Sequence, residues 1–359
     1  MCTLFDNVIQ FLRCNGMLHI PTLVIITIFI FLLGKSLFTE ILRRDKFCPK
    51  GKHVYITGGS SGLGKEIAKL MASKGAHAAR NREDHESLKF TAIFADLTDY
   101  DESIRALNEA SSKHNGRQNF VPANVKDSEF FFLLQITTKD AIKESLSLPR
   151  IFIEQPIKEF EKTMQLNYFG TLYTVHEAVK RMAQQNVKGK IVLVSSLLGL
   201  CGFIGYSSYA PTKHAIKGLV ECLRNELILY GISVHGYFAG TIDTPGYHEE
   251  MKIKPKVTHD IEGDSKVTSE QAAKSLYNGL CKGNVFITTD IVGDAIRASS
   301  LGISQANNAF YDAILCFIAW IVFKPMRWFG DKTVYNSRAM YPVVHDNKDK
   351  TLHDRYSIK

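Results

Sequence analysis

The feature that most constrains the fold is a glycine-rich turn between an apolar strand and an amphipathic helix. His53–Thr57 is typical of a buried strand, Gly58-Gly-Ser-Ser-Gly-Leu-Gly64 follows it, and a helix is predicted over Lys65–Lys74. Glycines allow the backbone to approach a pyrophosphate closely, and the free N–H groups at the start of the helix favour its negative charge. Because the turn stands between a strand and a helix, the pattern indicates a dinucleotide site.

A second motif, Tyr209-Ala-Pro-Thr-Lys213, follows an apolar strand that ends at Ser195-Ser196. Residues four apart on a helix share one face, about 5–6 Å apart at Cβ. A lysine ammonium in that position favours the phenolate, so the pKa of the tyrosine falls from its usual value of about 10. With a serine hydroxyl to hold a carbonyl or alcohol oxygen, the pattern predicts a carbonyl-reduction site. The spacing alone leaves a chance Tyr/Lys pair on a surface helix equally open.

Together these motifs resemble the short-chain dehydrogenase/reductase family, whose signatures are Thr-Gly-x-x-x-Gly-x-Gly and Tyr-x-x-x-Lys. The resemblance implies four catalytic residues, which are Asn167, Ser196, Tyr209 and Lys213. It implies an adenine contact for Asp96 and a nicotinamide contact for Thr241, although Thr241 also fits an ordinary Pro/Gly turn. The other cofactor-binding residues that the resemblance implies are Gly58, Ser60, Ser61, Gly62, Leu63, Gly64, Tyr209 and Lys213.

The choice of cofactor depends on the residue after the second strand. A site for NAD expects an acid about 20 residues beyond the first glycine, where it binds the ribose hydroxyl. Counted from Gly58, that point falls on Ala78-Ala79-Arg80, and no acid occurs before Glu83. A guanidinium there would pair with the 2′-phosphate of NADP. Arg80 therefore favours NADPH, with Arg82 as the second candidate.

The rest of the chain alternates strands and helices, as a parallel sheet requires. Helices are predicted over Phe160–Gln185 and Tyr206–Leu229, and strands over Lys190–Ser195 and Ser233–Phe238. The expected fold class is therefore α/β, a doubly wound, Rossmann-like parallel sheet. An N-terminal transmembrane helix and an apolar C-terminal segment are expected in addition to it.

Two stretches depart from the family pattern. Gly75–Arg80 leaves almost no second strand. No Asn-x-Ala-Gly turn occurs between Asn115 and Ser147, and Lys126–Lys139 is predicted to be foreign to the fold. A non-catalytic nucleotide-binding homologue therefore stays open as an alternative to an enzyme.

The uncharged run from Asn15 to Gly34 reaches the length of about 20 residues that spans a bilayer. A secretory signal peptide is the alternative, but Leu33–Leu37 is a poor cleavage site. Arg13 is the one positive residue before the run. Positive residues follow it at Lys35, Arg43, Arg44, Lys46, Lys50 and Lys52. The positive-inside rule therefore predicts a catalytic domain in the cytosol.

A second apolar stretch, Ala313–Phe323, has eleven residues, too few to span a membrane. Trp328 and Phe329 beside Lys324 and Arg327 suit a headgroup boundary, so an interfacial helix is favoured over a buried one. The predicted organisation is a leader (1–16), a transmembrane anchor (17–34), a basic linker (35–50), an NADP-binding reductase domain (51–300), a membrane-associated segment (301–340) and a polar tail (341–359).

The order of motifs and apolar segments is similar to that of family members that reduce a long-chain sphingoid ketone with NADPH at the cytosolic face of the endoplasmic reticulum. The similarity implies this ketone and this membrane as partners, with a possible homo-oligomer. A steroid, retinoid or acyl ketone remains an alternative substrate, because the fold does not choose it. The net charge of +8 forms no basic block interleaved with aromatics, so no nucleic acid is expected. The seven scattered cysteines show no zinc spacing.

Overall fold

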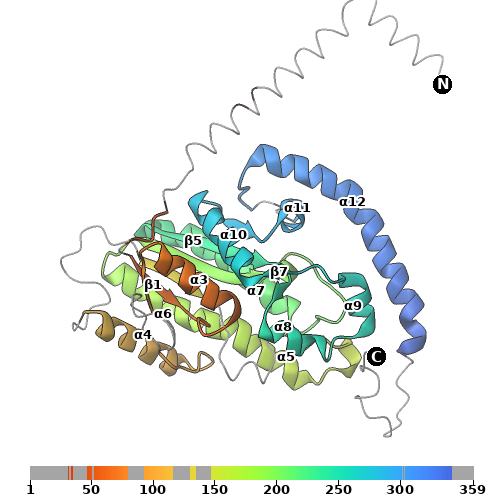
Figure 1. Cartoon of the computed structure of the whole chain (residues 1–359), viewed down its shortest axis with the longest axis horizontal. Coiled ribbons are helices and arrows are strands. Elements are labelled where there is room, and N and C mark those ends of the chain that lie inside the picture. Colours follow the sequence, from red (N-terminus) through yellow and green to blue (C-terminus); the bar gives the residue numbers. More distant parts are fainter. Residues whose placement is uncertain are drawn as a thin grey trace, which may run out of the picture.

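The computed structural model describes residues 31, 34, 47–50, 52–79, 93–115, 130–134, 147–300, 302 and 304–341. These residues form a parallel sheet with helices on both faces (Figure 1). The expected doubly wound α/β fold is therefore confirmed. The predicted leader, all but two residues of the transmembrane anchor, most of the basic linker and nearly the whole polar tail lie outside the described residues.

The main sheet has six parallel strands in the order β2-β1-β3-β4-β5-β8. Its strands are β1 (His53–Ile56), β2 (His77–Ala79), β3 (Phe130–Leu134), β4 (Gly189–Ser196), β5 (Ile232–Ala239) and β8 (Phe286–Thr288). A small second sheet pairs β6 (Ile242–Asp243) with β7 (Val267–Thr268). The strand order reverses between β1 and β3, and in such sheets ligands bind at the carboxyl ends of the strands beside this reversal.

The prediction that Lys126–Lys139 is foreign to the fold was wrong for Phe130–Leu134, and the rest of that stretch lies outside the described residues. Phe130–Leu134 forms β3, which pairs with β1 on one side and with β4 on the other. Phenylalanine and leucine suit a strand that is covered on both faces, where no polar alternation is needed. The second strand is short, as expected, but it exists: the three residues of β2 pair in parallel with β1 at the edge of the sheet.

The two faces of the sheet carry separate apolar cores. α3 (Gly62–Ser73) and α10 (Ser269–Cys281) cover one face, against Val192 and Val194 of β4. The other core packs around Ile191 and Leu193 of the same strand. The helices that contribute to it are α4 (Tyr100–Asn115), α6 (Gly170–Gln184) and α7 (Ala210–Glu226). Alternate side chains of β4 thus point to opposite layers, as strand geometry requires.

Two predicted helices have different bounds in the structure. The helix expected over Phe160–Gln185 consists of α5 (Ile157–Met164), a π-helical segment over Gln165–Phe169 and α6. The helix expected from Tyr206 begins at Ala210, because Pro211 suits the first helical turn, where its missing N–H costs nothing. Tyr209 is therefore the N-cap residue of α7 instead of an interior one.

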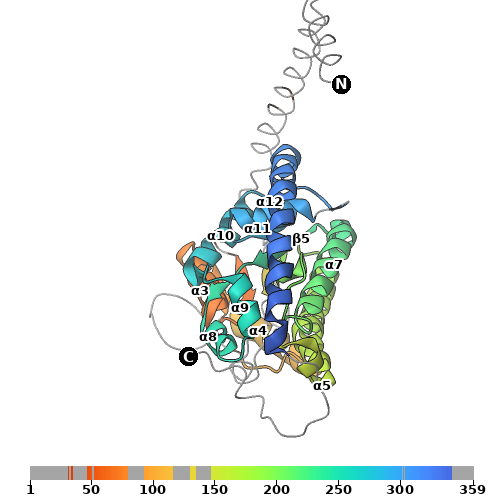
Figure 2. The same cartoon turned by 90° about the vertical axis from the view of Figure 1, so that its right-hand side faces the viewer.

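The C-terminal helix is longer than its apolar centre suggested. α12 (Ala309–Asn336) has 28 residues, so the length argument against a membrane span fails. Within the described part of the chain it is the one helix that is long and apolar enough to cross a membrane. It runs along the side of the domain and leaves most of its surface uncovered (Figures 1 and 2). Its large exposed side chains include Phe317, Trp320, Ile321, Trp328 and Phe329.

Candidate active site

A pocket of about 600 Å³ opens at the carboxyl edge of the main sheet. Its wall includes Ser61–Leu63 of the glycine-rich turn and Thr241 beyond β5. Asn167, Ser196, Tyr209 and Lys213 also line it. The structure therefore brings the four predicted catalytic residues together with the predicted pyrophosphate turn.

The glycine-rich turn lies between β1 and α3, as the sequence predicted. Gly58 and Gly62 adopt positive φ angles of 65° and 50°, which side chains rarely allow. A Cβ atom on Gly64 would lie 2.4 Å from the carbonyl oxygen of Gly58, so the start of α3 packs directly on the turn. Ser61 is the N-cap residue of α3, and the side chain of Leu63 is buried in the core. The turn thus forms a cradle of backbone atoms at a helix N-terminus, which fits a dinucleotide pyrophosphate.

Gly64→Ala is expected to weaken NADPH binding by at least about tenfold. The new methyl group must push the turn away from α3, and a tight steric insertion of this kind typically costs about 1–3 kcal/mol. Gly218→Ala is the matched control, because Gly218 lies in α7 and a Cβ atom added to it would meet nothing within 4 Å. The measurement is a fluorescence titration of both variants with NADPH. Unchanged affinity in Gly64→Ala would contradict the role of the turn.

The hydroxyl groups of Ser196 and Tyr209 meet in the pocket. Ser196 is the last residue of β4, and its Oγ accepts a hydrogen bond of 3.2 Å from the backbone N–H of Leu198. A hydrogen bond also joins Ser196 to Tyr209 and lowers the tyrosine pKa. Burial and the nearby Glu250 carboxylate outweigh this bond and raise the pKa above its ordinary value. Tyr209 therefore holds its proton at neutral pH.

Lys213 lies one helical turn beyond Tyr209, with its Nζ atom 5.3 Å from the centre of the tyrosine ring. Desolvation lowers the lysine pKa from 10.5 to about 8. The ammonium form therefore predominates at neutral pH, although burial makes it costly. The Tyr/Lys pair on a shared face is thus present as the spacing predicted. The expected fall in the tyrosine pKa is wrong, because burial and the Glu250 carboxylate raise the pKa of Tyr209 instead.

The desolvated ammonium makes Lys213 a stability cost. Below pH 8 the Lys213 side chain is protonated in both the folded and the unfolded chain. Between pH 8 and 10.5 the unfolded chain binds more protons at this side chain than the folded chain does. The free energy of unfolding of the wild type therefore rises with pH over this range. Lys213→Met is expected to raise the free energy of unfolding at pH 7 by about 1–3 kcal/mol. The advantage should shrink as the pH rises above 8. Thermal melts of both proteins from pH 6 to about 10 check this, and a pH-independent difference would contradict it.

Asn167 is 2 % exposed and lies in the π-helical segment between α5 and α6. Its Nδ2 atom donates a 3.1 Å hydrogen bond to Oγ1 of Thr212, whose own hydroxyl donates to the carbonyl oxygen of Tyr209 at 2.7 Å. These two hydrogen bonds therefore connect the π-helical segment that contains Asn167 to the first turn of α7. π-bulges of this kind often lie at functional sites.

Two close contacts fix β4 against α7. The hydroxyl of Ser195 donates a 2.9 Å hydrogen bond to the carbonyl oxygen of Lys213. A Cβ atom on Gly199 would lie 2.6 Å from Ser195 Oγ and 2.7 Å from that same carbonyl. A glycine at position 199 therefore permits the approach that places Ser196 beside Tyr209.

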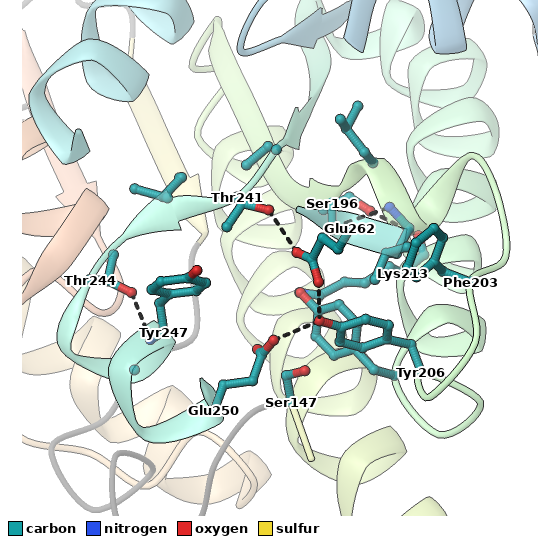
Figure 3. A pocket seen from close by; sticks show the side chains of 18 of the residues that line it. Ser147, Ser196, Phe203, Tyr206, Lys213, Thr241, Thr244, Tyr247, Glu250 and Glu262 are labelled. Atoms are coloured by element: carbon teal, nitrogen blue, oxygen red, sulfur yellow. Dashed lines mark hydrogen bonds between the residues drawn. The ribbon is translucent and has the colours of Figure 1, made fainter. Parts of the chain in front are cut away.

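A polar network that the sequence analysis missed lines the same pocket (Figure 3). The hydroxyl of Tyr206 lies 2.7 Å from Glu250 Oε1 and 3.0 Å from Glu262 Oε2, so these two carboxylate oxygens share its single proton. Lys254 Nζ lies 2.7 Å from Glu262 Oε2 and 3.1 Å from Glu250 Oε1. The i,i+4 spacing of Glu250 and Lys254 was the available signal, but the break between α8 (Pro245–Met251) and α9 (Lys256–Glu262) hid it.

Comparison with known proteins agrees with this geometry. The family model for short chain dehydrogenase matches residues 52–253, more than half of the 359-residue chain. The chain belongs to the short-chain dehydrogenase family. A solved short-chain dehydrogenase from Burkholderia phymatum, in complex with NAD, superimposes with a TM-score of 0.55 at 18% identity, over 72% of this chain and 95% of that one. This likeness shows the fold.

Two curated relatives of this short-chain dehydrogenase share one name. The 3-ketodihydrosphingosine reductase TSC10 of Cryptococcus neoformans is 34% identical, and the match covers 83% of this chain and 88% of the relative. The 3-ketodihydrosphingosine reductase of Dictyostelium discoideum is 32% identical, over 78% of this chain and 87% of the relative. Together with the family model, they make this chain an oxidoreductase that acts on a ketone.

The remaining predicted cofactor residues of this dehydrogenase lie in different surroundings. Asp96 is exposed, and its Oδ1 accepts from the backbone N–H of Thr98 at 2.9 Å and from the Thr98 hydroxyl at 2.7 Å. Thr241 Oγ1 donates to Glu262 Oε1 at 3.0 Å, so its hydroxyl contacts the polar network. Gly58, Ser60 and Gly64 lie in or beside the turn, whereas Arg80 and Arg82 lie outside the described residues.

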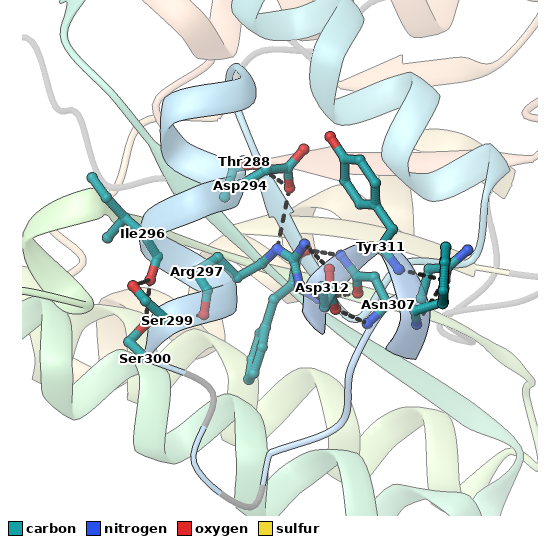
Figure 4. A network of polar contacts seen from close by, with 12 residues as sticks. Thr288, Asp294, Ile296, Arg297, Ser299, Ser300, Asn307, Tyr311 and Asp312 are labelled. Carbon is teal, nitrogen blue, oxygen red and sulfur yellow. Dashed lines mark hydrogen bonds and ion pairs between the residues drawn. The ribbon is translucent and has the colours of Figure 1, made fainter. Parts of the chain in front are cut away.

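α11 (Ile291–Ser299) and α12 close the far wall of the pocket, to which they contribute Val292, Ile296 and Met326. A buried ion pair holds the two helices together (Figure 4). Arg297 makes hydrogen bonds of 2.6 and 3.0 Å to the two carboxylate oxygens of Asp312, and each side chain is at most 3% exposed. The bidentate pair therefore fixes the start of α12 to the dehydrogenase domain.

Proposed function

We propose that this protein reduces 3-ketodihydrosphingosine to dihydrosphingosine with NADPH, a step of sphingolipid synthesis. The observation that carries the proposal is the convergence of Ser196, Tyr209 and Lys213 with the glycine-rich turn in one pocket. Carbonyl reduction needs a group that holds the oxygen, a proton donor and a site for the hydride carrier, and the pocket offers a candidate for each. The names of the curated relatives favour this ketone over others.

Each polar residue has a role in the proposed reaction. Ser196 holds the ketone oxygen, and Tyr209 donates a proton to it as the alcohol forms. The raised pKa of Tyr209 keeps that proton available. Lys213 stabilises the phenolate that remains, and Asn167 supports the return of a proton through water. Bound NADPH supplies the hydride that the carbonyl carbon receives.

NADPH is proposed in preference to NADH on the sequence at the end of β2. This strand pairs in parallel with β1, so it ends at the same edge of the sheet as the glycine-rich turn. β2 consists of His77-Ala78-Ala79, which include no acid to bind a ribose hydroxyl, and Arg80 is next in the sequence. Asp96 remains the proposed adenine contact, and Thr241 the proposed nicotinamide contact.

We place the enzyme on the endoplasmic reticulum membrane with its catalytic domain in the cytosol. The uncovered apolar surface of α12 supports attachment to lipid, as do two cation–π pairs on this helix. Lys324 Nζ lies 4.4 Å from the Trp320 ring and Lys332 Nζ lies 5.1 Å from the Trp328 ring, a combination suited to a headgroup boundary. Because Met326 of α12 also lines the pocket, a lipid chain would pass from the membrane along this wall.

The test is NADPH-dependent reduction of 3-ketodihydrosphingosine by membranes that contain the full chain, with product measured by mass spectrometry. Steroid, retinoid and acyl ketones are offered separately and in competition. Turnover of the sphingoid ketone alone supports the proposal. Preference for another ketone would replace the substrate, and NADPH binding without turnover of any ketone would favour a non-catalytic homologue.

A further inference from the structure

We infer that Glu250 and Glu262 bind the ammonium group that the sphingoid ketone carries beside its carbonyl, and that they thereby select an amino ketone over a neutral one. The inference rests on the proposed function and deepens it. It assigns a substrate-recognition role to two side chains that are no part of the Ser196/Tyr209/Lys213 site. Its basis is the charge, exposure and position of the network around Tyr206.

The network has one negative charge in excess. It contains two carboxylates, Glu250 and Glu262, and one ammonium, Lys254. Tyr206 contributes a neutral hydroxyl, because burial and the two carboxylates raise its pKa well above the ordinary value. A net charge on partly buried groups is costly unless a partner of opposite charge approaches it. A cation in the pocket would supply that partner.

The excess charge faces the pocket. The Lys254 side chain is 1% exposed and lies behind the network, whereas the side chains of Glu250 and Glu262 are 16% and 22% exposed. Both glutamates line the pocket and Lys254 does not. Among the described residues, no hydrogen bond to Glu250 Oε2 is made. The lysine therefore supports the carboxylates from one side and leaves their other side for a ligand.

The position matches the covalent structure of the substrate. In 3-ketodihydrosphingosine the carbon that bears the amine is bonded directly to the ketone carbon. A ketone oxygen held by Ser196 and Tyr209 therefore places the ammonium close to the tyrosine. The Tyr206 ring lies 6.2 Å from the Tyr209 ring, and the Glu250 carboxylate is near enough to raise the Tyr209 pKa. The network thus lies where the amine must be.

The other acidic side chains that line the pocket already have partners of their own. Glu249 and Asp290 add two carboxylates to the wall, against Lys213 as the lysine that lines it. Glu249 is neutralised by Lys252 at 2.7 Å, and Asp290 caps α11 through a 2.8 Å bond from the backbone N–H of Gly293. Glu250 and Glu262, in contrast, share the single ammonium of Lys254, so this pair keeps the excess negative charge that a substrate ammonium can meet.

The experiment compares two ketones with the full-length protein in membranes: 3-ketodihydrosphingosine, and the ketone of the same chain length and hydroxyl position that lacks the amine. We expect Glu250→Gln to lower kcat/KM for the amino ketone about 10- to 100-fold, as the loss of a charge-assisted hydrogen bond predicts. Turnover of the neutral ketone should fall much less, because burial, the larger cause, keeps the Tyr209 pKa raised without Glu250. The affinity for NADPH should change little. Glu262→Gln should show the same selective loss. It is prepared in parallel and serves as the test if Glu250→Gln folds poorly.

Glu270→Gln is the matched control. Glu270 is also paired with a lysine four residues away, but its side chain is 65% exposed and it does not line the pocket. An equal loss with both ketones in both pocket variants, or a wild type that does not distinguish the ketones, would overturn the ammonium site and leave the reductase proposal intact. If wild type reduces neither ketone although it binds NADPH, the proposed function fails and the inference with it.

Discussion

Tyr209→Phe is expected to lower the turnover of 3-ketodihydrosphingosine by about 10²–10⁴-fold, the usual contribution of a positioned general acid. The phenyl ring keeps the contact with Lys213 and the packing at the start of α7, so the fold and NADPH binding should be retained. The hydroxyl that meets Ser196 is the only group removed. The measurement is a single-turnover assay of product formation, with NADPH titrated by fluorescence in the same samples.

Tyr230→Phe is the control for this substitution. Tyr230 is half-exposed at the end of a short helix after α7 and does not line the pocket. It should therefore keep full activity. Equal turnover by wild type and Tyr209→Phe would exclude Tyr209 as the proton donor, and a loss of NADPH binding in that variant would show that the ring supports the cofactor site instead.

Asp312→Ala is expected to lower the free energy of unfolding by about 3–5 kcal/mol, because it leaves the buried Arg297 guanidinium without its main partner. Asp294, 3.1 Å from Arg297 Nε, compensates in part but is itself one-third exposed. The measurement is a thermal or denaturant melt of the full chain in detergent. Asp331→Ala, on the exposed surface of the same helix, is the control and should change the stability little.

A double variant makes this prediction sharper. Arg297→Met combined with Asp312→Leu removes both charges together and should recover much of the lost stability, because a buried pair replaced by apolar groups is often neutral. If Asp312→Ala alone melts like wild type, the ion pair does not hold α11 and α12 together. Recovery in the double variant would show that the unpaired charge, and not lost packing, caused the damage.

The sequence predicted those parts of the site that depend on short-range geometry. A strand, a turn with glycines at fixed positions and a helix leave few other arrangements, and the turn is found where it was expected. The Tyr209/Lys213 pair follows from the helical repeat in the same way. The start of α7 was misplaced because the hydrophobic pattern continues upstream of Ala210, whereas the backbone constraint of Pro211 decides the boundary.

The parts that were missed depend on contacts between distant segments. Phe130–Leu134 has no turn signature to mark it as a central strand, and its pairing with β1 and β4 is decided by the whole sheet. The length of α12 was underestimated because charged residues after Phe323 interrupt the apolar run without ending the helix. Tyr206 lies in the loop before α7, Glu250 in α8 and Glu262 in α9, so no spacing along the chain predicts that they meet.

The hydrogen bond from Ser195 to the Lys213 carbonyl spans 18 positions along the chain. Loop-closure entropy grows only slowly with loop length, by about 0.6 kcal/mol for each doubling, and so short a loop carries little of it. The relative positions of Ser196, Tyr209 and Lys213 are therefore decided within a single local segment. Changes in remote parts of the chain can reach these three side chains only through the strands and helices that border that segment, so the reactive geometry is buffered against variation elsewhere in the sequence.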